Sequence, residues 1–196
     1  MPKCYSEKER EYIIFRLKEE AAKCLAQYGV RRTTVDELVK RVNIPKGTFY
    51  LFYKSKELLL FEVIQEQHEA INNDLGMALS KLAGKPLSAD TLTDLIFQFF
   101  KKTEDMAILK MLDKDEVELL VRKLPREVVE AHLQDDTDTI SKMLSAFPVK
   151  KGIDVKVISA AFHAIYFATL HKSEIGEESY DEALRSLIYG IVVQMI

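Results

Sequence analysis

The sequence predicts an all-α protein in which an N-terminal three-helix domain precedes a larger helical domain. The chain has seven Gly and five Pro in 196 residues, fewer than the turns of an all-β protein need. Apolar residues recur at helical spacing along most of the chain, and no segment alternates long enough to predict a strand. We expect the first domain over residues 1–54 and the second over residues 55–196.

The first two helices are predicted from periodicity and from capping signals. Apolar residues recur every four positions within residues 6–28, at Ile13, Leu17, Ala21 and Leu25. Gly29 is expected to end this helix in the left-handed conformation. Thr34 and Glu37 form the Thr-x-x-Glu pattern of a capping box, so a second helix is expected to begin there.

A tight turn and a short third helix follow. Asn43 tolerates the left-handed conformation that such a turn requires, and Pro45 suits the first position of a helix. The third helix is expected over residues 46–52. Ser55 is a good cap for a fourth helix that starts at Lys56.

The rest of the chain also reads as helices. They are expected over residues 56–82, 89–102, 104–112, 115–123, 125–147, 154–172 and 178–195. The last two are apolar on almost every face, and a helix of that kind must be covered all round. A second copy of the chain is the expected cover, and a central position in a monomeric bundle is the alternative. The predicted dimer contacts are Phe162, Tyr166, Leu187 and Ile191.

Charge is distributed unevenly along the chain. Residues 1–60 hold 13 basic and 8 acidic residues, a net charge of +5, whereas the remainder holds 15 basic and 23 acidic residues, a net charge of −8. A basic N-terminal part favours an anionic partner for that part. The same excess also occurs on an ordinary solvated surface.

Residues 34–52 have the order of a helix-turn-helix, in which the second helix enters the major groove of DNA. Lys46, Thr48 and Tyr50 on that helix offer groups that contact phosphates and base edges. Gly47 removes a side chain where the backbone approaches DNA. Lys56 stands at the start of a helix, which favours an anion. A short connecting helix with exposed lysines is the alternative.

Residues 13–62 resemble the DNA-binding domain of the TetR family of transcriptional regulators. The resemblance rests on the order and spacing of four stretches, which are residues 21–29, 29–35, 46–50 and 54–59. It implies that Lys46, Gly47, Thr48 and Tyr50 meet base edges and phosphates. It also implies that Thr33, Thr34 and Lys56 grip the DNA backbone.

One departure from the family pattern concerns positions 52 and 53. The family usually has Tyr or His followed by Phe, whereas this chain has Phe52 followed by Tyr53. The phosphate contact expected at position 52 is therefore in question. Tyr53 either supplies the hydroxyl instead or fills the core position.

The resemblance also implies a mechanism. Two chains pair through the last two helices, and each chain contributes one recognition helix. The two helices bind half-sites whose centres are roughly 34–36 Å apart, or a multiple of that distance, so the operator is nearly palindromic. A small ligand in the second domain releases a repressor of this kind. We expect the ligand to be lipophilic and the protein to be cytoplasmic. The candidate pocket residues are His68, Phe97, Phe100, Met106, Met111, His163 and Phe167, with ordinary core packing or surface positions as the alternative.

Other functional classes are less well supported by the sequence. No HExxH, CxxC, P-loop or GxSxG pattern occurs, and Glu130 and His132 lack the Glu-x-x-His spacing of a di-iron bundle. The acidic cluster at residues 135–138 lacks the Gly and terminal Glu of a calcium loop. We therefore expect no enzyme activity, no cofactor, no metal and no membrane partner. The alternative function is a helix-turn-helix DNA-binding protein without a ligand-sensing role.

Overall fold

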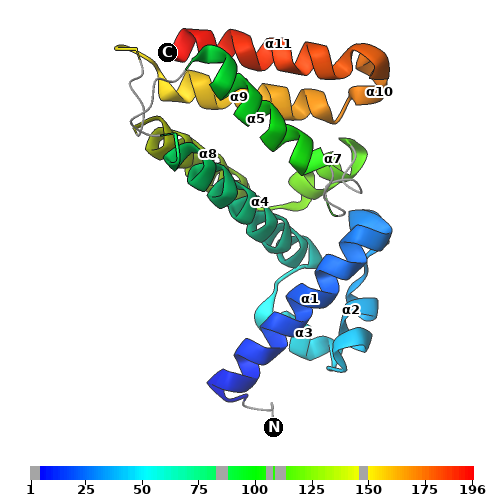
Figure 1. Cartoon of the computed structure of the whole chain (residues 1–196). Helices are drawn as coiled ribbons and strands as arrows, with labels where there is room; N and C mark the ends of the chain where they lie inside the picture. The colour runs from blue at the N-terminus through cyan, green and yellow to red at the C-terminus, as the bar shows by residue number, and fades with distance from the viewer. Residues whose placement is uncertain (1–4, 83–87, 105–107, 109–113, 146–149) are drawn as a thin grey trace. The chain divides into compact units, whose positions relative to one another are not determined.

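The computed structural model describes residues 5–82, 88–104, 108, 114–145 and 150–196, and these residues are helical or lie in turns (Figure 1). The helices are α1 (Glu7–Arg32), α2 (Val35–Val42), α3 (Lys46–Phe52), α4 (Lys56–Ser80), α5 (Ala89–Glu104), α7 (Lys114–Lys123), α8 (Arg126–Ser145), α9 (Val155–Thr169), α10 (Lys172–Ile175) and α11 (Glu177–Met195). The predicted all-α class is confirmed. Among the described residues, no helix combines the length and hydrophobicity needed to cross a membrane.

The chain packs as two compact units. One contains residues 1–68 and 106–124, and the other contains residues 69–105 and 125–196. The first unit therefore includes α7 in addition to the three N-terminal helices and the first part of α4. The domain boundary expected after residue 54 stays a prediction.

Local capping interactions define the helix ends of the first unit. Ser6 and Glu9 form a capping box at the start of α1. The Thr34 hydroxyl accepts a hydrogen bond from the Glu37 N–H at 3.2 Å, and the Ser55 hydroxyl accepts one from the Leu58 N–H at 3.3 Å. The expected starts of α2 and α4 are thus confirmed by their caps.

The turn between α2 and α3 has the predicted conformation. Asn43 is left-handed, with φ 57° and ψ 49°. The N–H of Ile44 donates to the carbonyl of Val39 at 3.0 Å, which closes the end of α2. Pro45 precedes the first residue of α3 instead of occupying it, so that expectation was wrong by one position.

Gly29 does not end α1 as expected. It interrupts the helix with φ 72° and ψ −175°, and helical structure continues to Arg32. The left-handed φ is as expected, but the extended ψ redirects the chain instead of terminating the helix. This combination of angles is essentially restricted to glycine.

Each unit has its own hydrophobic core. In the first unit, helices α1 to α4 bury Leu17, Leu25, Leu38, Phe49 and Leu59 completely. In the second unit, α11 packs against α5 and α9, as Figure 1 shows for α9 and α11. The core of that unit includes Ile96, Phe100, Ile165, Leu184 and Ile188. Of the helix expected over residues 104–112, only residues 104 and 108 are described.

Candidate nucleic-acid interface

Helix α3 has one buried face and one exposed face. Thr48 and Phe49 are buried and hold the helix in the first unit. The opposite face exposes Lys46, Gly47, Tyr50 and Leu51, and the exposed fractions of Tyr50 and Leu51 are 51% and 55%. A short helix that keeps an aromatic and an aliphatic side chain in solvent beside a lysine has a surface suited to contacts with base edges. We call these four residues the recognition face.

Gly47 leaves the middle of the recognition face open. A Cβ built at this position meets no atom of the chain within 4 Å, so packing inside the protein does not require glycine here. Glycine nevertheless costs stability within a helix. The predicted role of Gly47 in DNA binding stays a prediction.

Lys46 and Asp36 form an ion pair between α3 and α2. The Lys46 Nζ lies 2.8 Å from the Asp36 Oδ1, and both side chains are more than half exposed. The hydrogen bond to Asp36 raises the pKa of Lys46, so its ammonium group stays charged. An exposed ion pair of this kind contributes little to stability.

The start of α1 supports α3 through contacts that sequence reasoning missed. The Tyr5 hydroxyl and the Thr48 Oγ1 share a hydrogen bond of 3.1 Å, which joins residues 43 positions apart. The Arg10 guanidinium lies 5.1 Å from the centre of the Phe52 ring. Thr48 is thus buried and bonded inside the protein, and its predicted contact with DNA stays a prediction. No local sequence signal identifies these partners, because only the packing of α1 brings them to α3.

Thr33 and Lys56 lie together at the end of α1. The Thr33 hydroxyl donates to the Gly29 carbonyl at 2.7 Å. The Lys56 Nζ donates to the carbonyls of Val30 and Thr33 at 2.7 and 2.5 Å. Burial lowers the pKa of Lys56. The Lys56 side chain thus joins the start of α4 to the end of α1, whereas the Thr33 hydroxyl bonds within the end of α1. The predicted grip of both residues on the DNA backbone stays a prediction.

Thr34 and Tyr53 differ in how far they reach solvent. Thr34 is exposed and caps α2, so its backbone and hydroxyl lie at the surface beside the helix start. Tyr53 is only 9% exposed, and burial together with a hydrogen bond to Glu62 raises its pKa. Of the two roles left open for Tyr53, the structure places it at the core position.

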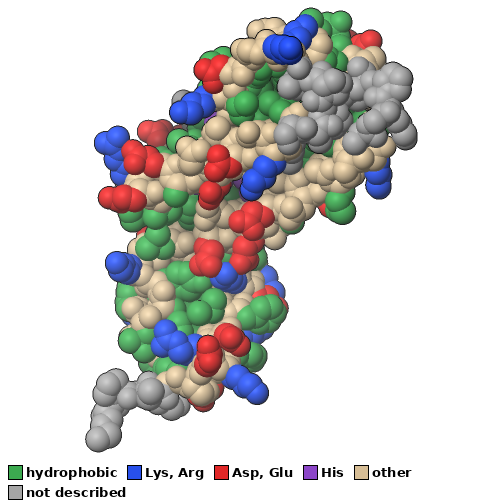
Figure 2. All heavy atoms as spheres, turned by 90° about the vertical axis from the view of Figure 1, so that its left-hand side faces the viewer, with side chains coloured by type: hydrophobic (Ala, Val, Ile, Leu, Met, Phe, Trp, Pro, Cys, Tyr) green, Lys and Arg blue, Asp and Glu red, His purple; other side chains and the backbone are tan. Residues whose placement is uncertain are grey.

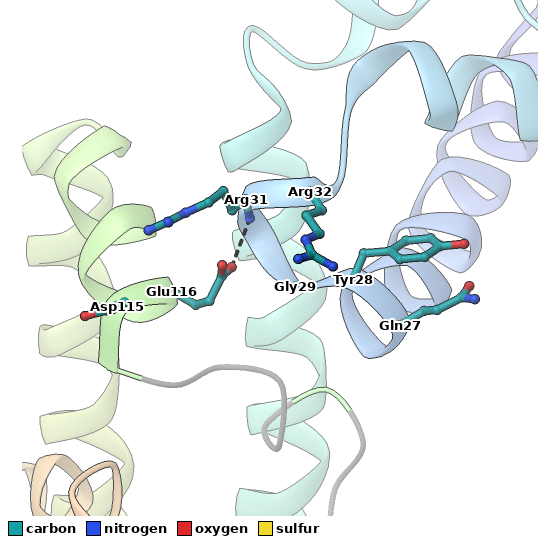
Figure 3. A pocket seen from close by; sticks show the side chains of 7 residues that line it. All are labelled: Gln27, Tyr28, Gly29, Arg31, Arg32, Asp115 and Glu116. Carbon is teal, nitrogen blue, oxygen red and sulfur yellow. Dashed lines mark hydrogen bonds between the residues drawn. The ribbon is translucent and has the colours of Figure 1, made fainter.

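A cavity of about 370 Å³ lies at the end of α1, between α1 and α7 (Figure 3). Its lining consists of Gln27, Tyr28, Gly29, Arg31, Arg32, Asp115 and Glu116. Within it the Glu116 carboxylate accepts a hydrogen bond from the Arg31 N–H at 2.9 Å (dashed in Figure 3). This contact fixes the last turn of α1, immediately before the cap of α2.

The predicted pocket residues of the second domain differ in their burial and contacts. Phe100 is buried in the core of the second unit, Phe97 packs against that core, and Phe167 is 55% exposed. His163 hydrogen-bonds to Asp136. Of the remaining predicted residues, His68 lies within α4 in the first unit, and Met106 and Met111 lie outside the described residues. The pocket assignment stays a prediction.

The predicted dimer residues fall into two groups. Phe162, Tyr166 and Ile191 pack against the core of the second unit, whereas Leu187 is 53% exposed. Further exposed apolar side chains on α9 and α11 are Val157, Phe167, Tyr189 and Val193. Figure 2 shows one face of the molecule, on which hydrophobic side chains lie in solvent among charged ones. Exposed apolar residues on these two helices are compatible with the predicted interface, which stays a prediction.

Comparison with known proteins places these features in a family. Residues 17–63 match the sequence model of a family described as bacterial regulatory proteins, tetR family. The chain is 19% identical over 179 residues to the fatty acid metabolism regulator protein of Bacillus subtilis (strain 168), an alignment that covers 91% of this chain and 92% of that protein. It is 44% identical over 45 residues to the uncharacterized HTH-type transcriptional regulator YhgD of the same organism, covering 23% of this chain and 24% of that protein.

Solved structures share the fold over most of the chain. A TetR-family transcriptional regulator from Mesorhizobium loti has a TM-score of 0.60 at 14% identity, covering 97% of this chain and 99% of that chain. SmeT, the repressor of the Stenotrophomonas maltophilia multidrug efflux pump SmeDEF, has a TM-score of 0.54 at 19% identity, covering 91% and 86%. FadR from Bacillus subtilis in complex with stearoyl-CoA has a TM-score of 0.53 at 18% identity, covering 91% and 95%.

The fold and the recognition face define a helix-turn-helix DNA-binding transcriptional regulator. The match of residues 17–63 shows a DNA-binding domain of the tetR family type, and the solved structures of TetR-family regulators share the fold over most of the chain. The resemblance seen in the sequence is thereby confirmed. The relatives named above are regulators, and none of them is described as an enzyme.

Proposed function

We propose that this protein is a homodimeric repressor that binds a near-palindromic operator and is released from it by a small lipophilic ligand. The observation that carries the proposal is the recognition face of α3, with Lys46, Gly47 and Tyr50 exposed on a helix held by buried Thr48 and Phe49. Such a regulator acts on chromosomal DNA in the cytoplasm.

Each exposed group of the recognition face has a separate role in the proposal. Lys46 leaves Asp36 and contacts a phosphate, and Gly47 lets the α3 backbone approach the DNA. Tyr50 donates its hydroxyl to a phosphate or touches a thymine methyl group. Thr34 contacts the DNA backbone beside the start of α2. Thr33 and Lys56 act by holding the end of α1, because their polar groups already bond to its carbonyls.

The exposed apolar side chains of α9 and α11 support the dimer. Val157 and Phe167 on α9 are 62% and 55% exposed. Leu187 and Val193 on α11 are also exposed. Apolar side chains gathered on two adjacent helices favour association with a second copy of the chain.

The ligand class is supported by the relatives and by one buried hydroxyl. Structural relatives bind stearoyl-CoA and triclosan, both of which carry large apolar parts. In the second unit, Thr93 on α5 is fully buried, and its Oγ1 has no hydrogen-bond partner among the described residues. A buried hydroxyl without a partner costs free energy, so a ligand that bonds to it gains affinity. Thr93 is therefore our candidate for a polar contact in an otherwise apolar effector site.

The test is the selection of bound sequences from a random duplex library by the purified full chain at near-physiological salt. We expect a near-palindromic motif whose half-sites are one helical turn apart or a multiple of it. Lys46→Ala combined with Tyr50→Phe should weaken binding to that motif by more than tenfold. Lys151→Ala is the control, because it removes an exposed lysine of the second unit and leaves the recognition face intact.

Other results would change the proposal. Sequence-independent enrichment that disappears as salt is raised would show that phosphate contacts alone bind the DNA. A selected motif without ligand-dependent release across acyl-CoA, triclosan and other apolar probes would favour the alternative, a DNA-binding protein without a sensing role.

A further inference from the structure

Helix α1, the long blue helix in Figure 1, carries an exposed aromatic pair on the side that faces away from the core of the first unit. Tyr12 and Phe15 are 64% and 63% exposed, and they are the most exposed large apolar side chains among the described residues. They are three residues apart, so they lie next to each other on the helix surface. The side chains that α1 buries, including Ile13 and Leu17, lie on the opposite side of a helix with 3.6 residues per turn.

The aromatic pair lies in the middle of a stripe with heptad spacing. Lys8, Tyr12, Phe15 and Glu19 are separated by four, three and four residues, the alternation that lines up side chains along one face of a coiled-coil helix. We call these four residues the α1 stripe. One end carries the ammonium group of Lys8 and the other end carries the carboxylate of Glu19. The pattern is that of a contact between helices, although both aromatic rings are exposed in the single chain.

The order of the residues makes the α1 stripe complementary to itself when a second helix runs in the opposite direction. Lys8 and Glu19 lie equally far from the midpoint of the stripe, and so do Tyr12 and Phe15. In an antiparallel pair with twofold symmetry, each Lys8 therefore lies opposite Glu19 of the other copy, and each Tyr12 lies opposite Phe15. A parallel pair would place like charges opposite each other at both ends. The charges thus favour the antiparallel arrangement.

The charged ends of the α1 stripe are available for this contact. Lys8 is exposed and forms no ion pair with any of the described residues. Glu19 bonds to Arg16 and Lys23 within α1, and its side chain is 36% exposed. A carboxylate has several acceptor positions, so it can accept a further ammonium group. Exposed ion pairs contribute little affinity, so the charges set the orientation while the aromatic rings supply most of the binding.

We propose that the α1 stripe binds the α1 stripe of a second copy of this chain in antiparallel orientation. The contact is separate from the dimer proposed through α9 and α11, because α1 belongs to the first unit and those helices belong to the second. A helical segment of about 12 residues is roughly 18 Å long. An interface of that length is small, so the association is weak and reversible.

A weak contact has its largest effect where chains are already close together. Chains bound at neighbouring sites on DNA have a high effective concentration for one another, which strengthens such a contact. We therefore expect the α1 contact to make the occupancy of adjacent operators cooperative, a consequence that rests on the proposed function. The contact itself does not require DNA.

The experiment measures the association of the purified full chain without DNA. Sedimentation velocity from micromolar to about millimolar concentration should show a reversible step beyond any dimer that is present at micromolar concentration. Tyr12→Ala combined with Phe15→Ala should weaken that step roughly tenfold or more, since the aromatic rings supply most of the contact. Val121→Ala is the matched control, because Val121 is an exposed apolar residue of the same unit outside the stripe. A parent chain without this step would overturn the proposal.

Charge reversal tests the orientation of the two helices. Lys8→Glu places a carboxylate opposite Glu19 of the second copy, and Glu19→Lys places an ammonium group opposite Lys8, so each variant should weaken the association several-fold. The double variant Lys8→Glu/Glu19→Lys restores opposite charges at both ends, and its association should return to within about twofold of the parent. Association that stays weak in the double variant would overturn the pairing with a second copy and would favour an unlike partner, such as another protein or a lipid surface.

Two further measurements separate this proposal from the proposed function. Leu187→Glu should keep the α1 step, because Leu187 lies on α11 in the second unit, and loss of the step in that variant would assign the association to α11 instead. Circular dichroism establishes that each variant is folded before its association is compared. Selection of an operator by the parent tests the proposed function on its own. A chain that selects an operator but shows no α1 step would refute only the α1 contact.

Discussion

The carboxylate of Glu116 accepts a hydrogen bond from the backbone N–H of Arg31, at 2.9 Å and across 85 residues of sequence. The break at Gly29 leaves donors near the end of α1 without helical partners, and the side chain from α7 takes one of them. Arg31 is followed by Thr33, whose hydroxyl bonds back to Gly29, and by Thr34, which caps α2. The position of the helix-turn-helix thus depends partly on α7.

Replacing Glu116 should destabilise the first unit. Glu116→Ala removes the acceptor for the Arg31 N–H, and we expect a loss of about 1 kcal/mol in the free energy of unfolding. Chemical denaturation measures it. Glu118→Ala is the control, because Glu118 is exposed on the same helix. Glu116→Gln should lose less, since its amide oxygen still accepts. Equal losses in the Glu116→Ala and Glu118→Ala variants would contradict the role assigned to the contact.

Gly29→Ala should cost about 1–3 kcal/mol in the free energy of unfolding, because its backbone angles are almost exclusive to glycine. A Cβ there would also lie 3.0 Å from the Glu116 Oε2. That oxygen ends a flexible side chain, so we assign most of the cost to the backbone. The double variant Gly29→Ala/Glu116→Ala separates the two causes. If Gly29→Ala caused no loss in the free energy of unfolding when it is introduced into the Glu116→Ala variant, the clash with the Glu116 side chain would be the dominant cause instead.

Gly47→Ala should have opposite effects on stability and on DNA binding. Alanine is a better helix former, and the new Cβ meets no atom of the chain, so stability should rise by about 0.5–1 kcal/mol. Operator affinity should fall, because the methyl group occupies the space through which the backbone approaches DNA. Thermal unfolding and a binding titration on the same sample measure both. An unchanged affinity would place Gly47 away from the DNA.

Leu187→Glu should convert the dimer to monomers. The glutamate carboxylate would lose its hydration in the proposed apolar interface and would have no cation to pair with there. The free-energy cost of that desolvation opposes association of the two chains. Sedimentation velocity at micromolar concentration reports the oligomeric state. Leu133→Glu on α8 is the matched control, since Leu133 is similarly exposed at 45% but lies outside the proposed interface. A parent protein that is already monomeric would remove the dimer and the palindromic operator together.

Thr93→Val should leave the free energy of unfolding unchanged or increase it, because valine fills the same space without an unpaired hydroxyl. The proposed role in ligand binding predicts a loss of response. Stearoyl-CoA and triclosan are suitable probes, with the shift in melting temperature as the measure. A probe that stabilises the parent and the variant equally would show that Thr93 does not contact it.

Local interactions are the part of this structure that short stretches of sequence predict. The caps at Thr34 and Ser55 and the left-handed turn at Asn43 involve partners within four residues, so a short window of sequence contains all the information. These signals place α2, α3 and α4 and hence the helix-turn-helix. Lys46 and Tyr50 lie four residues apart, so their spacing places them on one face of α3.

Contacts between distant segments depend on how the helices pack, which no short stretch of sequence specifies. Lys56 carries the charge expected for a DNA contact, yet the folded chain brings two α1 carbonyls to its ammonium group. Thr48 meets Tyr5, Arg31 meets Glu116 and His163 meets Asp136 in the same way. Each of these pairs joins segments that only helix packing brings together. A polar side chain bonds to whichever partner packing places nearby, and that choice depends on the core as a whole.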